Sequence, residues 1–304
     1  MALTLAAAAE LLDRHHLLRE IIQGDCWTDD AANLADADKP FTAITYDTRK
    51  VVPGTLLCCK GRFKAEYLTD IDTTGLAAYV AETEYSAVTR TPGLIVNDAR
   101  KAMSLLSAEF YGRPQDKLTV IGITGTKGKT TTAYYIKSIV DAWLAGQGHR
   151  ESALLSTIVT DDGVERRPAK LTTPEPLDLQ RHLWNAVSAG ADYLTMEVSS
   201  QALKYGRVIG VELACAVFLN IGEDHISPVE HPDLEDYLNS KLLIFQQARS
   251  ACVCLDCDHV ERVRAAAAAC PRVVTFSQKF PSADVYGSQV PQGGGEDRLP
   301  CAHP

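Results

Sequence analysis

The sequence has no uninterrupted apolar stretch long enough to cross a membrane, which takes about 20 residues in a helix. The N-terminus also lacks the basic lead of a secretory signal peptide, and Glu10 and Asp13 interrupt its apolar run. We therefore expect a cytoplasmic protein with no membrane partner. Residues 3–22 are predicted to form an amphipathic helix instead of a signal peptide.

The sequence lacks an excess of positive charge. It contains 30 Lys and Arg residues against 39 Asp and Glu residues, a formal net charge of −9. Proteins that bind nucleic acids non-specifically take their affinity from a basic surface. We therefore expect no nucleic-acid partner, whereas a local basic site for a phosphorylated small molecule is compatible with this composition.

A disulfide framework is absent as well, because the nine cysteines are irregularly scattered and odd in number, as expected of reduced thiols. Cys252, Cys254, Cys257 and His259 have the ligand types of a zinc site but not the spacing of a zinc finger. The same stretch, 251–255, has the composition of a buried strand, whose alternate side chains point to opposite faces. Both interpretations are open, and the strand is favoured.

With 304 residues the chain is long enough for two domains. Residues 1–113 are predicted to form a mixed α/β domain. Residues 114–290 alternate strand and helix patterns, which indicates a doubly wound, mostly parallel α/β sheet with helices on both faces. The tail, 291–304, contains several Gly and Pro residues, and we expect it to be disordered or cut short.

The expected elements follow from apolar periodicity and from the turn residues between them. Strands are predicted at 43–46, 55–59, 77–81, 94–96, 118–123, 153–160, 193–198, 214–219, 251–255 and 273–276. Helices are predicted at 99–111, 131–144, 177–188, 234–248 and 260–268.

Residues 120–132 have the pattern of a strand, a glycine-containing loop and the start of a helix. Gly125 and Gly128 allow a tight turn whose N–H groups approach a ligand, and Lys129 adds a positive charge. The standard P-loop has a further glycine where this chain has Ile123, so only the shorter pattern is present. A helix that begins after the loop would direct its N-terminal N–H groups at an anion, so we expect a nucleotide-phosphate site.

Polar residues follow two further predicted strands. Glu197 ends one strand, and Asp224-His225 comes after the next, so the carboxyl ends of parallel strands would bring them near the loop. A carboxylate there can hold Mg²⁺. Histidine is an uncommon Mg²⁺ ligand, and Lys241 on the following helix could equally be a surface lysine.

The loop, Gly125-Thr-Lys-Gly-Lys-Thr130, resembles the ATP loop of Mur ligases and of folylpolyglutamate synthases, which join an amine to a carboxylate. Other segments occur in the order seen in Mur ligases: Thr172-Thr-Pro-Glu175, Met196-Glu-Val-Ser-Ser-Gln201, Arg207-Val208 and Asn220-Ile-Gly-Glu-Asp-His225 through Lys241. The N-terminal Tyr46-Asp-Thr-Arg-Lys50, with Pro53-Gly54 and Lys60-Gly61, is similar to the UDP-binding domain of the MurE type.

This resemblance implies a role for each matching residue. Lys129 would neutralise the β- and γ-phosphates of ATP, and Thr130 with Glu197 would hold one Mg²⁺. His225 and Lys241, the latter carbamylated by CO₂, would join a second Mg²⁺ site. The implied ATP-binding set is Gly125, Thr126, Lys127, Gly128, Lys129, Thr130 and Thr131, and the implied substrate-binding set is Thr48, Arg62, Phe63, Thr172, Thr173, Ser199 and Arg207.

The implied reaction is ATP-dependent amide formation. The γ-carboxylate of UDP-N-acetylmuramoyl-L-alanyl-D-glutamate would be phosphorylated, and the amine of a diamino acid would attack the acyl phosphate. The stretch 224–232 resembles members of the family that add L-lysine more than those that add meso-diaminopimelate.

The chain departs from the family pattern in three ways. Lys127 stands where asparagine is usual, and Gln201 where histidine is frequent. The C-terminal ligase domain is absent from the expected architecture, so the resemblance implies a fragment or short form that is incomplete for turnover. A non-catalytic module that binds nucleotide and UDP-substrate, a folylpolyglutamate synthase-like ligase, and a MurT-type amidotransferase subunit are the alternatives.

Overall fold

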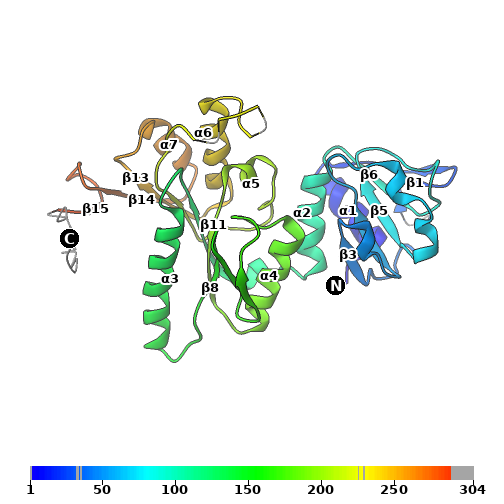
Figure 1. Cartoon of the computed structure of the whole chain (residues 1–304), viewed down its shortest axis with the longest axis horizontal. Helices are drawn as coiled ribbons and strands as arrows, with labels where there is room; N and C mark the ends of the chain where they lie inside the picture. The colour runs from blue at the N-terminus through cyan, green and yellow to red at the C-terminus, as the bar shows by residue number, and fades with distance from the viewer. Residues whose placement is uncertain (1, 32–33, 35, 225, 229, 289–304) are drawn as a thin grey trace. The chain divides into compact units, whose positions relative to one another are not determined.

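The computed structural model describes residues 2–31, 34, 36–224, 226–228 and 230–288. The chain forms two compact units (Figure 1). The first unit contains the residues up to Pro114 together with Pro174–Trp184 and Tyr205–Gly210, and the second contains the remainder. The division of the sequence into 1–113 and 114–290 stays a prediction, and the predicted tail, 291–304, lies outside the described residues.

The first unit has a six-stranded sheet in the order β2-β1-β6-β5-β4-β3. Neighbours from β3 to β6 are parallel, whereas β1 is antiparallel to both β6 and β2. The strands are β1 (Leu18–Gln23), β2 (Cys26–Thr28), β3 (Ala43–Thr45), β4 (Thr55–Cys58), β5 (Ala78–Ala81) and β6 (Gly93–Val96). The helices α1 (Leu5–Arg14) and α2 (Ala99–Phe110) belong to this unit, as does the part of α4 (Pro176–Ser188) up to Trp184.

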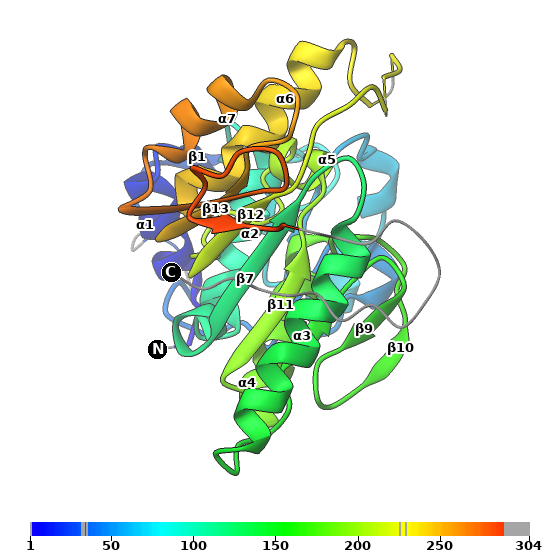
Figure 2. The same cartoon turned by 90° about the vertical axis from the view of Figure 1, so that its left-hand side faces the viewer.

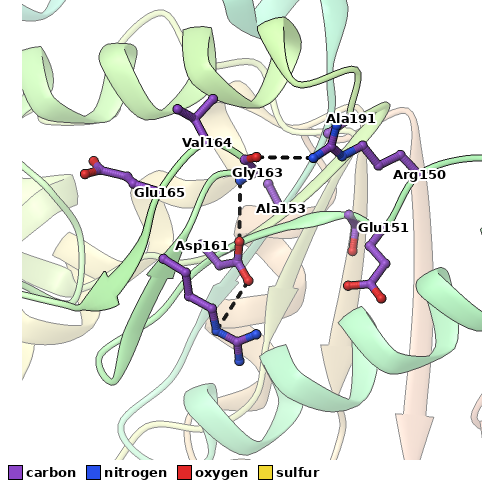
Figure 3. Close-up of a pocket in the computed structure, with 10 residues that line it drawn as sticks. Arg150, Glu151, Ala153, Asp161, Gly163, Val164, Glu165 and Ala191 are labelled. Atoms are coloured by element: carbon purple, nitrogen blue, oxygen red, sulfur yellow. Dashed lines mark hydrogen bonds and ion pairs between the residues drawn. The ribbon is translucent and has the colours of Figure 1, made fainter.

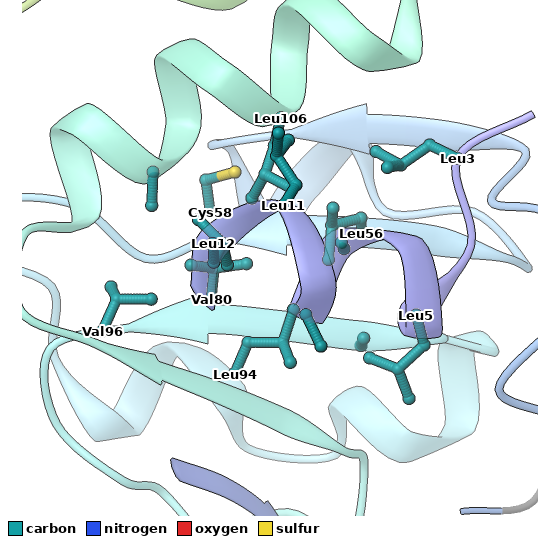
Figure 4. Close-up of a cluster of buried hydrophobic side chains, with 14 of the residues drawn as sticks. Leu3, Leu5, Leu11, Leu12, Leu56, Cys58, Val80, Leu94, Val96 and Leu106 are labelled. Carbon is teal, nitrogen blue, oxygen red and sulfur yellow. The ribbon is translucent and has the colours of Figure 1, made fainter. Parts of the chain in front are cut away.

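The core of the first unit follows from the alternation of strand side chains. Leu56 and Cys58 of β4 pack in one buried cluster with α1 and α2, and Leu57 between them packs in another. Figure 4 shows the first cluster, in which Leu11, Leu12 and Leu106 of the helices meet strand residues. Fully burying a leucine side chain contributes about 1.5–3 kcal/mol, so this face holds the helices on the sheet.

The predicted helix over 3–22 is wrong in its second half. The helix begins after Thr4, whose hydroxyl accepts a hydrogen bond from the Ala7 N–H at 3.1 Å, and it ends at Arg14. His16 has a φ of 55°, which reverses the chain into β1. Ile21 and Ile22 then pack in different clusters on the two faces of the sheet, a long-range arrangement that local periodicity cannot show.

The second unit has a nine-stranded sheet in the order β10-β9-β8-β11-β7-β12-β13-β14-β15. Neighbours from β8 to β15 are parallel, and β8, β9 and β10 form antiparallel pairs. The strands are β7 (Thr119–Thr124), β8 (Ala153–Leu155), β9 (Val159–Asp161), β10 (Arg166–Pro168), β11 (Tyr193–Glu197), β12 (Cys215–Phe218), β13 (Ser250–Cys254), β14 (Arg272–Ser277) and β15 (Val285–Tyr286).

Helices cover both faces of this sheet, as predicted. Ala133 of α3 packs against Ile123 and Val217, whereas Phe218, which points to the opposite face, stacks on Phe245 with ring centroids 6.1 Å apart. Figure 2 shows α3 across the strands β7 and β11. The helices of the chain's second half are α3 (Lys129–Ala145), α4 (Pro176–Ser188), α5 (Ser200–Lys204), α6 (Leu234–Leu242) and α7 (Val260–Ala267).

Two predictions for this region are corrected. The predicted strand at 153–160 is two antiparallel strands, because Ser156 forms a tight turn in which its N–H and hydroxyl both donate to the Val159 carbonyl. The predicted helix at 234–248 is α-helical only to Leu242 and continues as a 3₁₀ segment, Leu243–Gln247.

Over the described part of the chain, no helix combines the length and apolarity that spanning a membrane would require.

Candidate functional site

The loop predicted to hold phosphate lies at the carboxyl end of the central strand β7, between β11 and β12. Gly128 has a φ of 84°, a left-handed conformation that favours glycine, and α3 begins at the next residue, Lys129. The predicted strand, loop and helix are therefore present, with the helix starting two residues before Thr131. Free N–H groups at this helix start are suited to an anion.

The loop is anchored to the end of β12 by Asn220. The Lys127 N–H donates to the Asn220 side-chain oxygen at 3.0 Å, and the Asn220 amide donates back to the Lys127 carbonyl at 3.0 Å. The Thr126 N–H donates to the Asn220 carbonyl at 3.1 Å. These bonds use the backbone of Lys127 and leave its exposed side chain outside the anchor.

Two lysines donate to one carbonyl oxygen of the loop. Lys129 Nζ lies 2.8 Å and Lys241 Nζ lies 3.0 Å from the Gly125 oxygen. Burial lowers the pKa of Lys129, while the charges of Glu197 and Asp224 act in the opposite direction. Lys241 is 1% exposed, so it is not a surface lysine.

The environment of Lys241 disfavours its positive charge. Burial, reinforced by the nearby charge of Lys129 and opposed by Asp224, lowers the pKa of Lys241 to about 7. Its Nζ also lies 4.5 Å from the ring centroid of Tyr237, on the same helix. Near neutral pH both the charged and the neutral form of the Lys241 amine are therefore populated.

Glu197, at the end of β11, has no exposed surface. Its Oε1 accepts hydrogen bonds from the Thr130 hydroxyl and the Thr157 N–H, both at 2.8 Å, and its Oε2 accepts one from the Thr157 hydroxyl at 3.0 Å. The structure thus brings the predicted pair, Thr130 and Glu197, together. Thr157 was missed, because it follows β8 in a stretch that the sequence pattern presents as one strand.

The predicted substrate residues of the second unit adjoin this carboxylate. The Thr172 hydroxyl oxygen lies 3.2 Å from the Thr157 hydroxyl oxygen, within hydrogen-bond distance. Thr173 donates to the backbone oxygen of Glu197 at 3.0 Å and accepts from the Ser199 N–H at 3.0 Å. Hydroxyl groups therefore gather around the carboxyl end of β11.

A hydrogen-bonded chain that the sequence did not reveal supports the same region. His231 is fully buried, with Nδ1 2.6 Å from Asp236 Oδ2 and Nε2 2.9 Å from Ser200 Oγ. Lys204 Nζ also lies 2.7 Å from Asp236. These contacts tie α5 to the start of α6, which carries Lys241. The predicted ligand His225 lies outside the described residues.

The remaining predicted substrate residues belong to the first unit. Thr48 begins a 3₁₀ turn, Thr48–Lys50, and is half-buried. Arg62 is exposed, and half-buried Phe63 packs edge-on against Tyr67, with centroids 5.4 Å apart. Arg207 forms an ion pair with Glu175. The phosphate loop, in contrast, belongs to the second unit.

The alternative zinc site receives no support from the described residues. Cys252, Cys254, Cys257 and His259 do not supply three ligand atoms within 4.8 Å of one another. Burial raises the pKa of Cys252 to about 12 and that of Cys257 to about 11, whereas zinc binds the thiolate. Cys252 and Cys254 lie on β13, as the strand interpretation predicted.

A separate hollow of about 310 Å³ lies beside the start of β8 (Figure 3). The phosphate loop lies at the other, carboxyl ends of the parallel strands. Arg150, one of the two cations that line the hollow, donates to the carbonyl oxygens of Ala189 at 2.8 Å and Gly163 at 3.3 Å. Arg166 pairs with Asp161 across the hairpin at 3.6 Å. None of the described residues of the candidate site lines this hollow, so the hollow is separate from it.

Comparison with known proteins gives consistent matches. The family model of the Mur ligase middle domain matches residues 123–299. A UDP-N-acetylmuramyl-tripeptide synthetase of Bifidobacterium longum is 60% identical over 279 residues, covering 91% of this chain and 53% of that protein. A UDP-N-acetylmuramoyl-L-alanyl-D-glutamate–L-lysine ligase of Streptococcus pneumoniae is 43% identical over 251 residues, covering 82% and 50%.

A solved structure, that of a UDP-N-acetylmuramoyl-L-alanyl-D-glutamate–2,6-diaminopimelate ligase, is similar with a TM-score of 0.72 and 25% identity. The match covers 85% of this chain and 53% of that one. The chain spans about half the length of the curated relatives described here.

Proposed function

The chain belongs to the Mur ligase family, and from that premise we propose that it supplies the ATP-binding and nucleotide-sugar-binding parts of a peptidoglycan-precursor ligase. The substrate would be UDP-N-acetylmuramoyl-L-alanyl-D-glutamate, to which a diamino acid is joined. The name of the Bifidobacterium longum relative, a tripeptide synthetase, supports this substrate class.

The observation that carries the proposal is the pair of lysines at the loop. Lys129 and Lys241 both donate to the Gly125 oxygen, which places two nitrogen donors beside the start of α3. The β- and γ-phosphates of ATP would replace that carbonyl as the partner of Lys129. Residues 125–131 would enclose the phosphates with their N–H groups.

Thr130 and Glu197 fit a Mg²⁺ ion, since hydroxyl and carboxylate oxygens are the hard ligands that this ion prefers. They already lie 2.8 Å apart, and the carboxylate is buried at the end of β11. When bound, Mg²⁺ would neutralise charge on the phosphates. Thr157 would keep the Glu197 carboxylate oriented through its N–H and hydroxyl.

Lys241 and His225 would hold a second Mg²⁺, with Lys241 in carbamylated form. An ammonium would repel the ion, whereas a carbamate supplies a hard oxygen. The lowered pKa of Lys241 supports this role, because CO₂ adds to the neutral amine.

The reaction would proceed in two steps. The γ-phosphoryl group of ATP is transferred to an oxygen of the D-glutamyl γ-carboxylate, which gives ADP and an acyl phosphate. The amine of the diamino acid then attacks the acyl carbon, phosphate leaves with its bonding electrons, and the nitrogen releases one proton to solvent. The contribution of this chain is to align the two reactants and neutralise charge through Lys129.

Thr172, Thr173, Ser199 and Arg207 would hold the nucleotide-sugar peptide, and Thr48, Arg62 and Phe63 would lie near its uridine. L-Lysine is the favoured diamino acid over meso-diaminopimelate. The relative named as an L-lysine ligase is 43% identical to this chain, which supports that choice.

Calorimetric titration of the purified chain with Mg-ATP tests the central claim. Lys129→Ala should weaken binding by at least about tenfold, since a charge-assisted hydrogen bond to phosphate contributes about 1.5–3 kcal/mol. Lys117→Ala is the matched control, because Lys117 is exposed and precedes the opposite end of β7. Equal affinities for Mg-ATP in all three proteins would refute the assignment of the loop.

A further inference from the structure

Glu175 lies in a cavity of the first unit whose volume is about 250 Å³. The lining residues are Lys60, Gly61, Arg100, Met103, Glu175, Pro176, Tyr205 and Arg207. Three of these side chains carry positive charge and one, Glu175, carries negative charge. The cavity therefore has a surplus of cations and favours an anionic ligand.

Glu175 bridges two of the cations. Its Oε1 lies 2.9 Å from Arg207 Nη2, and its Oε2 forms an ion pair with Lys60 Nζ. The three side chains are only 16–22% exposed, so water screens these charges poorly. One carboxylate thus occupies the donors that an incoming anion would use.

The two cations are also held in ways that do not involve Glu175. Lys60 Nζ lies 4.5 Å from the ring centroid of Tyr46, and the Tyr46 hydroxyl donates to Asp178 at 2.8 Å. The segment that carries Arg207 is fixed to α2 by a 2.7 Å hydrogen bond from the Ser104 hydroxyl to the Gly206 carbonyl. The positions of both cations would therefore persist if the carboxylate moved away.

We propose that Glu175 is an internal competitor, a carboxylate that occupies Lys60 and Arg207 until an anionic group of the nucleotide-sugar peptide displaces it. The inference rests on the proposed function, in which Arg207 binds that substrate. It adds Lys60 as a second binding cation and makes Glu175 a residue that lowers the affinity for that substrate. Exchange of one anion for another keeps both cations paired throughout, so neither is left buried without a partner.

The test compares the dissociation constant of UDP-N-acetylmuramoyl-L-alanyl-D-glutamate for the unmodified chain and for Glu175→Gln by calorimetry. Removal of the competing charge should tighten binding at least about fivefold at low salt, as expected for release of an ion pair worth about 1 kcal/mol. The gain should shrink as salt is added. Thermal stability should fall in the same variant, because its ion pairs are lost.

Glu109→Gln is the matched control. It removes the same charge from the first unit, where Glu109 of α2 pairs with Arg113 at 3.2 Å and does not line the cavity. Substrate affinity should be little changed in this variant. Lys60→Met should weaken substrate binding. In the Lys60→Met background, Glu175→Gln should increase substrate affinity less than it does in the unmodified chain.

UDP-N-acetylglucosamine distinguishes the two possible sources of the anion, since it has the diphosphate but no carboxylate. If Glu175→Gln binds both ligands more tightly than the unmodified chain does, the diphosphate is the group that enters the cavity. If only the dipeptide ligand is bound more tightly, a carboxylate is that group. Unchanged or weaker binding in Glu175→Gln, with the unmodified chain binding normally, would overturn this inference and leave the proposed function intact. Absence of binding to the unmodified chain would overturn both.

Discussion

Lys241 donates a hydrogen bond from its buried Nζ to the carbonyl oxygen of Gly125, 116 positions earlier in the chain, at 3.0 Å. Lys129 donates to the same oxygen. A charged Lys241 at this position is repelled by Lys129 and has almost no contact with water. The hydrogen bond holds α6 against the phosphate loop. Burial and the charge of Lys129, in contrast, disfavour the charged form of the Lys241 amine.

We predict that Lys241→Met increases stability below about pH 7 and that this advantage shrinks as the pH rises. The folded pKa is about 7 against an ordinary value of 10.5, so between these values the folded state binds fewer protons than the unfolded state. The unmodified chain therefore gains stability with pH in that range, by at most about 1.4 kcal/mol per pH unit. Methionine at this position does not titrate.

The measurement is urea unfolding of both proteins at several pH values between about 6 and about 9, in buffer freed of CO₂ so that the amine is not modified. Lys117→Met, at an exposed position, is the control and should follow the unmodified chain. A stability difference between Lys241→Met and the unmodified chain that is independent of pH would contradict the shifted pKa.

Carbamylation of Lys241 can be detected without turnover. In buffer that contains ¹³C-bicarbonate, a fraction of the neutral amine should add CO₂, and a carbamate carbon signal should appear in the NMR spectrum of the chain. Added Mg²⁺ should increase the signal, since the ion would bind the carbamate oxygen. Lys241→Met should abolish it and Lys117→Met should retain it; persistence of the signal in Lys241→Met would assign it to another amine.

Glu197→Gln should fold normally but lose most of the Mg²⁺ dependence of ATP affinity. The amide oxygen can still accept from Thr130 and the Thr157 N–H, so these two hydrogen bonds survive while the charge that attracts the ion is removed. Calorimetric titrations with ATP in the presence of Mg²⁺ or of EDTA measure the effect.

The control for this variant is Glu151→Gln, because Glu151 is exposed at the opposite end of the parallel strands. This substitution removes the same charge and should leave the Mg²⁺ dependence intact. An unaltered difference between the Mg²⁺ and EDTA titrations in Glu197→Gln would remove Glu197 from the metal site.

The parts of the fold and site that the sequence predicted are those with local signals. Gly125, Gly128 and Lys129 lie within a few residues of one another, so the pattern of strand, loop and helix is visible without the fold. Glu197 was found because it ends an apolar run. The Mur ligase family, predicted from ordered motifs, is confirmed by the match over residues 123–299.

The parts that the sequence did not predict depend on contacts between distant segments. β1 is a strand because it pairs with β6, although its residues continue the apolar pattern of α1. The bridge from Glu175 to Lys60 joins residues 115 positions apart, and no local pattern indicates it. Thr157 was missed because a turn at Ser156 divides a stretch that has the composition of a single strand.

His231 provides the last prediction, because it is buried and bonded at both ring nitrogens. Since a carboxylate only accepts, Nδ1 donates to Asp236, and Nε2 shares a hydrogen bond with the Ser200 hydroxyl. His231→Ala removes both hydrogen bonds and leaves a cavity in place of the buried ring, so urea unfolding should show a loss on the order of 3 kcal/mol. His149→Ala is the control, since His149 lies 2.8 Å from Asp192 but both side chains are about half exposed, and its loss should be below about 1 kcal/mol. Equal losses in the two variants would show that the buried chain from Ser200 to Asp236 does not stabilise the region that carries Lys241.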